Sequence, residues 1–178
     1  MKKLSILLLI TVLLTACSVT KVDKVEKKDK FAIEYSISTD HKFVYAKIHD
    51  IFDIFDGGTG IIYFADSDQE KSIIYTKNIN KIFNNLKVDK VYYYNPSNIK
   101  NNNTKYYREL LNYVDGYTSV DEDENPSLDI PSLYFVKKGN IVGYLSPVDK
   151  NVDNLMKKKT KKKLQKDIEK CLEEYKRA

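Results

Sequence analysis

The spacing of apolar residues along the chain predicts alternating strands and helices. Residues 31–37 alternate loosely between apolar and polar, as a half-buried strand does. Residues 43–55 carry apolar side chains at helical spacing, and two glycines follow them, which predicts a helix that ends there. Residues 61–65 (IIYFA) form a continuous apolar run of the kind found in buried parallel strands.

The rest of the chain continues this order. A helix over about 67–86 and a strand over 91–95 are followed by a helix over 106–114. Residues 133–145 read as strand, tight turn and strand, and residues 154–177 read as a strongly amphipathic helix. Three βα units, a hairpin and a last helix predict an α/β fold with a mixed central sheet flanked by helices.

The first residues follow the pattern of a secretory signal peptide. Lys2 and Lys3 precede an apolar stretch over residues 4–14, which is shorter than the roughly 20 residues that span a bilayer. Residues 14–17 (LTAC) resemble the lipobox of bacterial lipoproteins. This resemblance implies cleavage after residue 16, a diacylglyceryl group (palmitate or a similar acyl chain) on Cys17, and attachment to the outer side of the cell membrane.

The predicted domain boundaries follow from this reading. Residues 1–16 are the signal peptide, and residues 17–30 are the lipidated N-terminus and a flexible, mostly charged tether. Residues 31–178 are the folded domain. The formal net charge of +5 falls when the signal lysines are removed, so nothing indicates a nucleic-acid partner. With Cys17 acylated, Cys171 is the remaining cysteine, which excludes a disulfide within the mature chain.

Three segments, in order, resemble the thioredoxin family. Gly60–Phe64 is similar to the strand that leads to a thioredoxin active site, and residues 91–95, the third predicted strand, follow it in the expected order. Residues 130–143 (IPSLYFVKKGNIVG) are similar to the cis-proline loop and terminal hairpin. The resemblance covers about residues 43–178. It is closest to exported thioredoxin-like proteins of low-G+C Gram-positive bacteria, some of them described as bacteriocin-transport accessory proteins.

The chain departs from this family at the redox motif. Counting from Phe64, the positions of Cys-x-x-Cys hold Gln69, Glu70, Lys71 and Ser72. Dithiol exchange needs one thiol to attack and a second to resolve the mixed disulfide, so it is excluded at this site. The motif S-x-x-E over residues 67–70 predicts a capping box instead.

The predicted function is therefore non-enzymatic, with no cofactor and no metal site. We expect a redox-inactive thioredoxin-like domain in the cell envelope that binds a protein or peptide in the groove beside Ile130 and Pro131, with a cis bond between them. One alternative is a thiol-disulfide-related enzyme that acts through Cys171 or with a partner's cysteines, although Cys171 lies on the apolar stripe of the last helix and reads as core. Another is an accessory subunit of an export or envelope complex. The lysine run over residues 157–163 predicts a solvated face or a contact with anionic lipid or cell-wall polymer.

Overall fold

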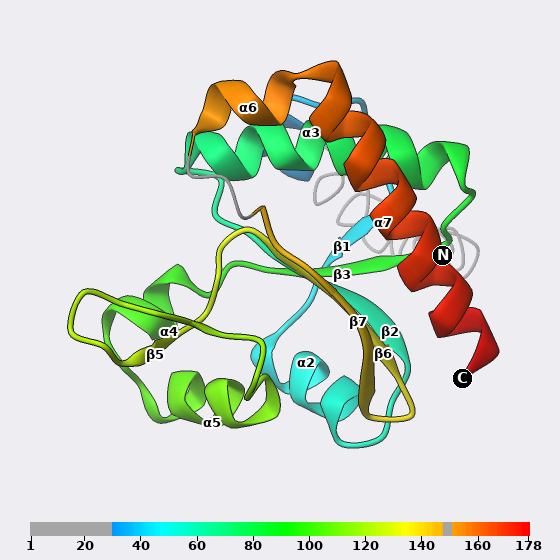
Figure 1. Ribbon diagram of the computed structural model, residues 1–178. Coiled ribbons are helices and arrows are strands. Elements are labelled where there is room, and N and C mark those ends of the chain that lie inside the picture. Colours follow the sequence, from blue (N-terminus) through cyan, green and yellow to red (C-terminus); the bar gives the residue numbers. More distant parts are fainter. Residues whose placement is uncertain (1–29, 148–150) are drawn as a thin grey trace, which may run out of the picture.

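Five strands form one mixed sheet in the computed structural model, which describes residues 30–147 and 151–178. Their order across the sheet is β1-β3-β2-β6-β7 (Figure 1). β1, β3 and β2 run parallel, whereas β6 is antiparallel to β2 and β7 is antiparallel to β6. The strands are β1 (Phe43–Tyr45), β2 (Gly60–Phe64), β3 (Val91–Tyr94), β6 (Ser132–Lys137) and β7 (Asn140–Leu145). The predicted α/β class and mixed sheet are confirmed.

Helices cover both faces of this sheet (Figure 1). α3 and α7 pack on one face together with a helical segment at residues 30–35, and α2 and α5 pack on the other. The bounds of the helices are α2 (Ile48–Phe55), α3 (Glu70–Asn85), α4 (Ser97–Asn101), α5 (Lys105–Tyr113), α6 (Val152–Met156) and α7 (Lys158–Arg177). A small second sheet pairs β4 (Ser119–Val120) with β5 (Pro126–Ser127).

The central strand β2 contributes side chains to the hydrophobic cores on both faces of the sheet. Because successive side chains of a strand point to opposite faces, Ile61 and Tyr63 enter the core under α3 and α7. Ile62 and Phe64 enter the core under α2 and α5. All five residues of β2 are buried, which explains why its sequence is a continuous apolar run rather than an alternating one.

The predicted terminal hairpin is confirmed. β6 and β7 meet at a tight turn in which Lys138 and Gly139 have φ angles of 48° and 78°. Two consecutive positive φ angles are the geometry of a type I′ turn, which suits the twist of a hairpin. A Cβ atom on Gly139 would lie 2.8 Å from the carbonyl oxygen of Phe55, so glycine is needed here for space as well as for φ.

Residues 31–37 are not a strand as the alternation predicts, because residues 30–35 are helical. Phe31 and Tyr35, one helical turn apart, are fully buried, while Ile33 between them is 78% exposed. Lys30 and Glu34 form an ion pair at 3.6 Å with the same spacing. On so short a segment, apolar residues at i and i+4 fit a helical turn as well as period-two alternation.

Two further boundaries differ from the prediction. The helix expected over residues 43–55 is a strand, β1, followed by a shorter helix, α2, because the apolar residues at its start pair with β3. The helix expected over residues 154–177 is divided into α6 and α7 by Lys157, whose backbone is extended at φ −64° and ψ 137°.

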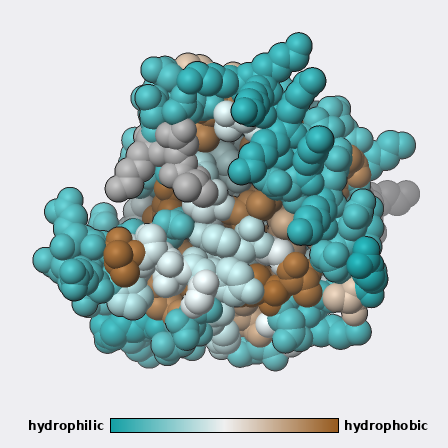
Figure 2. All heavy atoms as spheres, in the orientation of Figure 1, coloured by the Kyte–Doolittle hydropathy of each residue, from teal (hydrophilic) through white to brown (hydrophobic). Residues whose placement is uncertain are grey.

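The predicted signal peptide, Cys17 and all but the last residue of the predicted tether lie outside the described residues. Among the residues that are described, no helix is both long enough and apolar enough to cross a bilayer. The surface seen in Figure 2 is hydrophilic over α7 and more apolar over the terminal hairpin.

Candidate functional site

The candidate site lies at the edge of the sheet where the parallel strands end. Phe64, the last residue of β2, pairs with Ser132, the first residue of β6. The segment from Ala65 to Gln69 therefore shares this edge with Ile130 and Pro131. In open α/β sheets, the crevice outside the carboxyl ends of parallel strands is the usual place for ligands.

Asp66 is the centre of the hydrogen bonding at this edge, although its side chain is only 8% exposed. One carboxylate oxygen, Oδ1, accepts hydrogen bonds from the N–H of Asp68 at 3.0 Å and from Nδ2 of Asn95 at 3.2 Å. The other, Oδ2, accepts the Ser97 hydroxyl at 2.6 Å and Nε2 of Gln69 at 3.4 Å. These donors come from the β2–α3 loop and from the segment after β3, so one carboxylate joins the ends of two neighbouring strands.

The environment of Asp66 favours its ionised form. Burial raises the pKa of this carboxyl, but the hydrogen bonds from Ser97, Asp68, Asn95 and Gln69 outweigh burial, so that its pKa lies below the ordinary value. A charged acceptor forms stronger hydrogen bonds than a neutral one. Asp66 is therefore a fixed negative charge just before the positive N-terminal end of α3.

The residues at the positions of the redox motif form the N-cap and the first turn of α3. Gln69 is the exposed N-cap residue, and its N–H donates to the Asp66 carbonyl at 3.1 Å. Glu70 is exposed and Lys71 is half-buried in the first turn. Ser72 is fully buried, and its hydroxyl accepts the N–H of Asp66 at 3.3 Å. The structure thus gives Ser72 a structural role.

The capping box predicted over residues 67–70 is wrong. α3 begins at Glu70, and its N-cap is Gln69, whose side chain makes no capping hydrogen bond. The Asp66 carboxylate accepts the N–H of Asp68, and this forms a turn that delays the start of the helix. The sequence signal that was missed is an aspartate directly after a buried strand, with Asn95 directly after the neighbouring strand.

The Ile130–Pro131 peptide bond is cis, as predicted. The polypeptide on either side of Ile130 is held by side chains. The Leu128 carbonyl accepts Nζ of Lys100 at 3.0 Å, and the Asp129 carbonyl accepts the Ser132 hydroxyl at 2.6 Å.

The anchoring continues on both sides of the cis bond. Tyr144 donates to Oδ2 of Asp129 at 2.8 Å, and Ser146 donates to the Pro131 carbonyl at 3.3 Å. Within the described part of the chain, neither the N–H nor the C=O of Ile130 has a hydrogen-bond partner. Ile130 is half-buried, so its main-chain groups sit unpaired in an otherwise fixed loop.

A hollow of about 290 Å³ opens along the same edge, beyond the end of β3. Its lining includes Ser67, Tyr94 and Asn95, together with Glu34 and Tyr45. Tyr45 donates to Oε2 of Glu34 at 2.5 Å, which fixes one wall of the hollow. The edge therefore offers, in order across the sheet, a polar hollow, the Asp66 cluster and the loop at Ile130.

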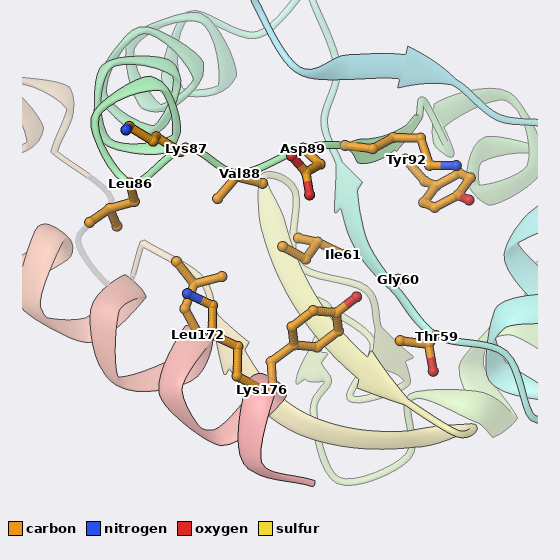
Figure 3. A pocket seen from close by; sticks show the side chains of 12 residues that line it. Thr59, Gly60, Ile61, Leu86, Lys87, Val88, Asp89, Tyr92, Leu172 and Lys176 are labelled. Carbon is orange, nitrogen blue, oxygen red and sulfur yellow. The ribbon is translucent and has the colours of Figure 1, made fainter.

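A second pocket, of about 320 Å³, lies at the opposite edge of the sheet, near the ends of α3 and α7 (Figure 3). Figure 3 shows Ile61 and Leu172 at its apolar part and Asp89 and Tyr92 along its rim. Lys87, Lys90 and Lys176 also line this pocket. Across the described chain, no group of three or more His, Cys, Asp or Glu side chains is placed to hold a metal ion.

Cys171 is half-buried on α7, where it packs against the core under α3 and α7. A Cβ atom added to Gly143 would lie 2.8 Å from its Sγ, so the thiol faces β7 closely. Burial, with a smaller effect of Asp167, raises the pKa of the Cys171 thiol. Less thiolate is then present at neutral pH, which disfavours a role as a nucleophile. The thiol is not at the candidate site.

Comparison with known proteins identifies no relative: no protein-family model, curated protein or solved structure matches the chain. The structure defines the chain as an α/β protein with a mixed five-stranded sheet between two layers of helices.

Replacing Asp66 by asparagine should lower the free energy of unfolding at pH 7 by about 2 kcal/mol, because the hydrogen bonds to a charged acceptor are weakened. The folded-state pKa of Asp66 is lowered, so this contribution is fully present above the unfolded pKa of about 3.9. It is lost as the pH falls through the folded-state value. The difference between wild type and Asp66→Asn, measured by urea unfolding, should therefore shrink below about pH 4.

Asp68→Asn is the matched control, because its side chain is exposed and only its main chain joins the cluster. It should change the stability by less than about 0.5 kcal/mol. Equal effects of the two variants, or an Asp66→Asn effect that does not depend on pH, would show that the carboxylate does not hold this edge together.

Proposed function

We propose that this protein is an exported lipoprotein whose thioredoxin-like domain has lost redox chemistry and binds an extended polypeptide in the cell envelope. Two features of the domain support the thioredoxin-like assignment. The elements follow one another as expected, with βα units, then an antiparallel hairpin and a terminal helical segment. A cis-proline stands at the start of β6, at the same edge as the start of α3.

The loss of redox chemistry rests on the residues at the start of α3. A thiol-disulfide exchange needs an ionisable sulfur, and here that end of the helix carries Gln69 and Ser72. The Ser72 hydroxyl is buried and engaged with the Asp66 main chain. Cys171, on α7, has a raised pKa and packs into the core, so the structure favours binding over thiol catalysis.

The unpaired main chain of Ile130 is the single observation that carries the binding proposal. An extended peptide binds to such a segment by main-chain hydrogen bonds, as a strand added to a sheet does. The loop needs no rearrangement to accept it, because Lys100, Ser132 and Ser146 already hold the neighbouring carbonyls. Preorganisation of this kind lowers the entropy cost of binding. The hollow beside Ser67 gives room for a side chain of the bound peptide.

The attachment to a membrane rests on the lipobox resemblance at residues 14–17. Two acyl chains on Cys17 provide stable anchoring, whereas one chain binds a bilayer only marginally. The charged residues between Cys17 and the helical segment at 30–35 then separate the domain from the bilayer.

Acylation should depend on Cys17 and not on the other cysteine of the chain. Cells that express the protein are fed a clickable palmitate analogue, and the purified protein is examined for label. Wild type and the control Cys171→Ala should both be labelled, because the lipobox offers Cys17 as its acyl acceptor. Cys17→Ala should carry no label. A label that persists in Cys17→Ala, or that disappears in Cys171→Ala, would contradict the lipoprotein assignment.

Binding at the sheet edge is tested with a reduced, carboxymethylated polypeptide, which stays unfolded and cannot exchange disulfides. Its addition should shift the amide resonance of Ile130 in a ¹⁵N NMR spectrum. Gln69→Arg places a long charged side chain at the start of α3 and should weaken binding about tenfold, which corresponds to about 1.4 kcal/mol.

Asn112→Arg is the matched control, since it makes the same charge change at an exposed position of α5 on the other face of the sheet. It should bind as wild type does. Gln69→Arg loses only the long hydrogen bond from Nε2 to Asp66, so both variants should remain folded, which thermal unfolding checks. An Ile130 amide that does not respond, or an equal loss of affinity in the two variants, would rule out this edge as the binding site.

A further inference from the structure

The first two turns of α7 carry an unusual concentration of positive charge. Six of the seven residues from 157 to 163 are lysines, and all six are exposed. No residue is buried in this part of the helix, and the buried positions of α7, Ile168 and Leu172, come later. Figure 2 shows the hydrophilic surface that covers this helix.

This arrangement is unfavourable for the helix itself. The N-terminal end of a helix carries partial positive charge and favours acidic residues, yet the first turn of α7 has none. Lysines four residues apart, such as Lys158 and Lys162, also repel each other. The acidic residues of α7 all lie at position 167 or later.

The rest of the described domain does not neutralise the run. None of the ion pairs found in the described residues involves a lysine between 157 and 163. Lys157 donates to the neutral side chain of Asn154, which balances no charge. Within the described residues this cluster of like charges thus has no acidic partner in an ion pair, and an external anion would stabilise it.

The run lies on the same helical layer through which the N-terminal part of the chain enters the domain. Phe31, in the first turn of the described chain, belongs to the hydrophobic core under α3 and α7, as does Ile168. In Figure 1 the start of α7 stands beside α6 above α3, in this layer. The lysine run and the first described helical segment are therefore both on the helical layer of the domain that covers this face of the sheet.

We propose that the lysine run at 157–163 is a docking surface for the anionic lipid headgroups of the membrane to which the chain is anchored. Lysines near a negatively charged bilayer surface are attracted to it, and the attraction decays within a Debye length. The contact orients the domain on the membrane. It goes beyond the proposed function, because it concerns a surface separate from the sheet edge at Ile130 and requires no bound peptide.

The test uses the unlipidated chain from Ser18 to Ala178, which contains every described residue, so its outcome does not depend on acylation. Binding is measured by co-sedimentation with vesicles of phosphatidylcholine alone or mixed with phosphatidylglycerol. The chain should bind the anionic vesicles and not the neutral ones, and added salt should release it.

A quadruple variant, Lys158→Gln, Lys159→Gln, Lys162→Gln and Lys163→Gln, should bind anionic vesicles about tenfold more weakly or worse. Its melting temperature should equal or exceed that of wild type, since like charges at the helix start are removed. The matched control removes the same number of exposed lysines elsewhere, by the changes Lys47→Gln, Lys90→Gln, Lys105→Gln and Lys138→Gln. This control should retain most of the affinity.

Equal losses in the two quadruple variants would overturn the proposal, because net charge alone would then explain binding. Equal binding of wild type to neutral and anionic vesicles, or no binding to either, would overturn it as well. Binding to soluble polyphosphate is measured as well. If the protein binds polyphosphate more tightly than the anionic vesicles, the ligand of the lysine run is an anionic polymer and the lipid proposal is overturned.

Discussion

The carboxylate of Asp66 accepts hydrogen bonds from four donors in two separate segments of the chain. It stands between the end of the central strand and the start of α3, where the chain must turn sharply. The carboxylate accepts a hydrogen bond from the Asp68 N–H, which forms that turn. Its hydrogen bonds with Asn95 and Ser97 hold the loop against the segment that follows β3. The position of α3, and with it one face of the hydrophobic core, depends on this arrangement.

The proposed function depends on how this carboxylate organises the sheet edge. Thiol-disulfide exchange at this edge would need an accessible sulfur that ionises to a thiolate. Here the edge is a network of fixed hydrogen bonds around a negative charge, with Ser72 buried beneath it. What remains available is main chain at Ile130 and a polar hollow beside Ser67. These two features are the observations on which the proposed binding of a polypeptide rests.

The sequence was sufficient for the features that depend on long apolar runs or strong turn signals. Local residue patterns predicted the buried strand β2 and the hairpin around Lys138 and Gly139. The cis bond before Pro131 was expected from the resemblance of residues 130–143 to a cis-proline loop. The segment at residues 30–35 was misread because Phe31, Ile33 and Tyr35 fit period two as well as one helical turn. Only the contacts with the core decide which of these residues point inward.

The Asp66 cluster escaped prediction for a different reason. Two of its four donors, Asn95 and Ser97, lie about thirty residues away in sequence, after β3, and become neighbours of Asp66 only when β2 and β3 pair in parallel register. The motif at residues 67–70 predicts a capping box instead. The hydrogen bonds of a capping box are weaker than those that the ionised Asp66 carboxylate accepts. The pairing of Ser132 with Phe64, which brings Ile130 to the same edge, is likewise a property of the sheet.

The side-chain carboxyl ¹³C resonance of Asp66, followed by NMR as the pH is lowered, tests the central claim most directly. If the carboxylate is the charged acceptor that holds the sheet edge, its titration midpoint lies below the ordinary aspartate value of about 3.9. A midpoint at or above that value would mean that burial outweighs the hydrogen bonds. The edge would then not be organised by a fixed negative charge.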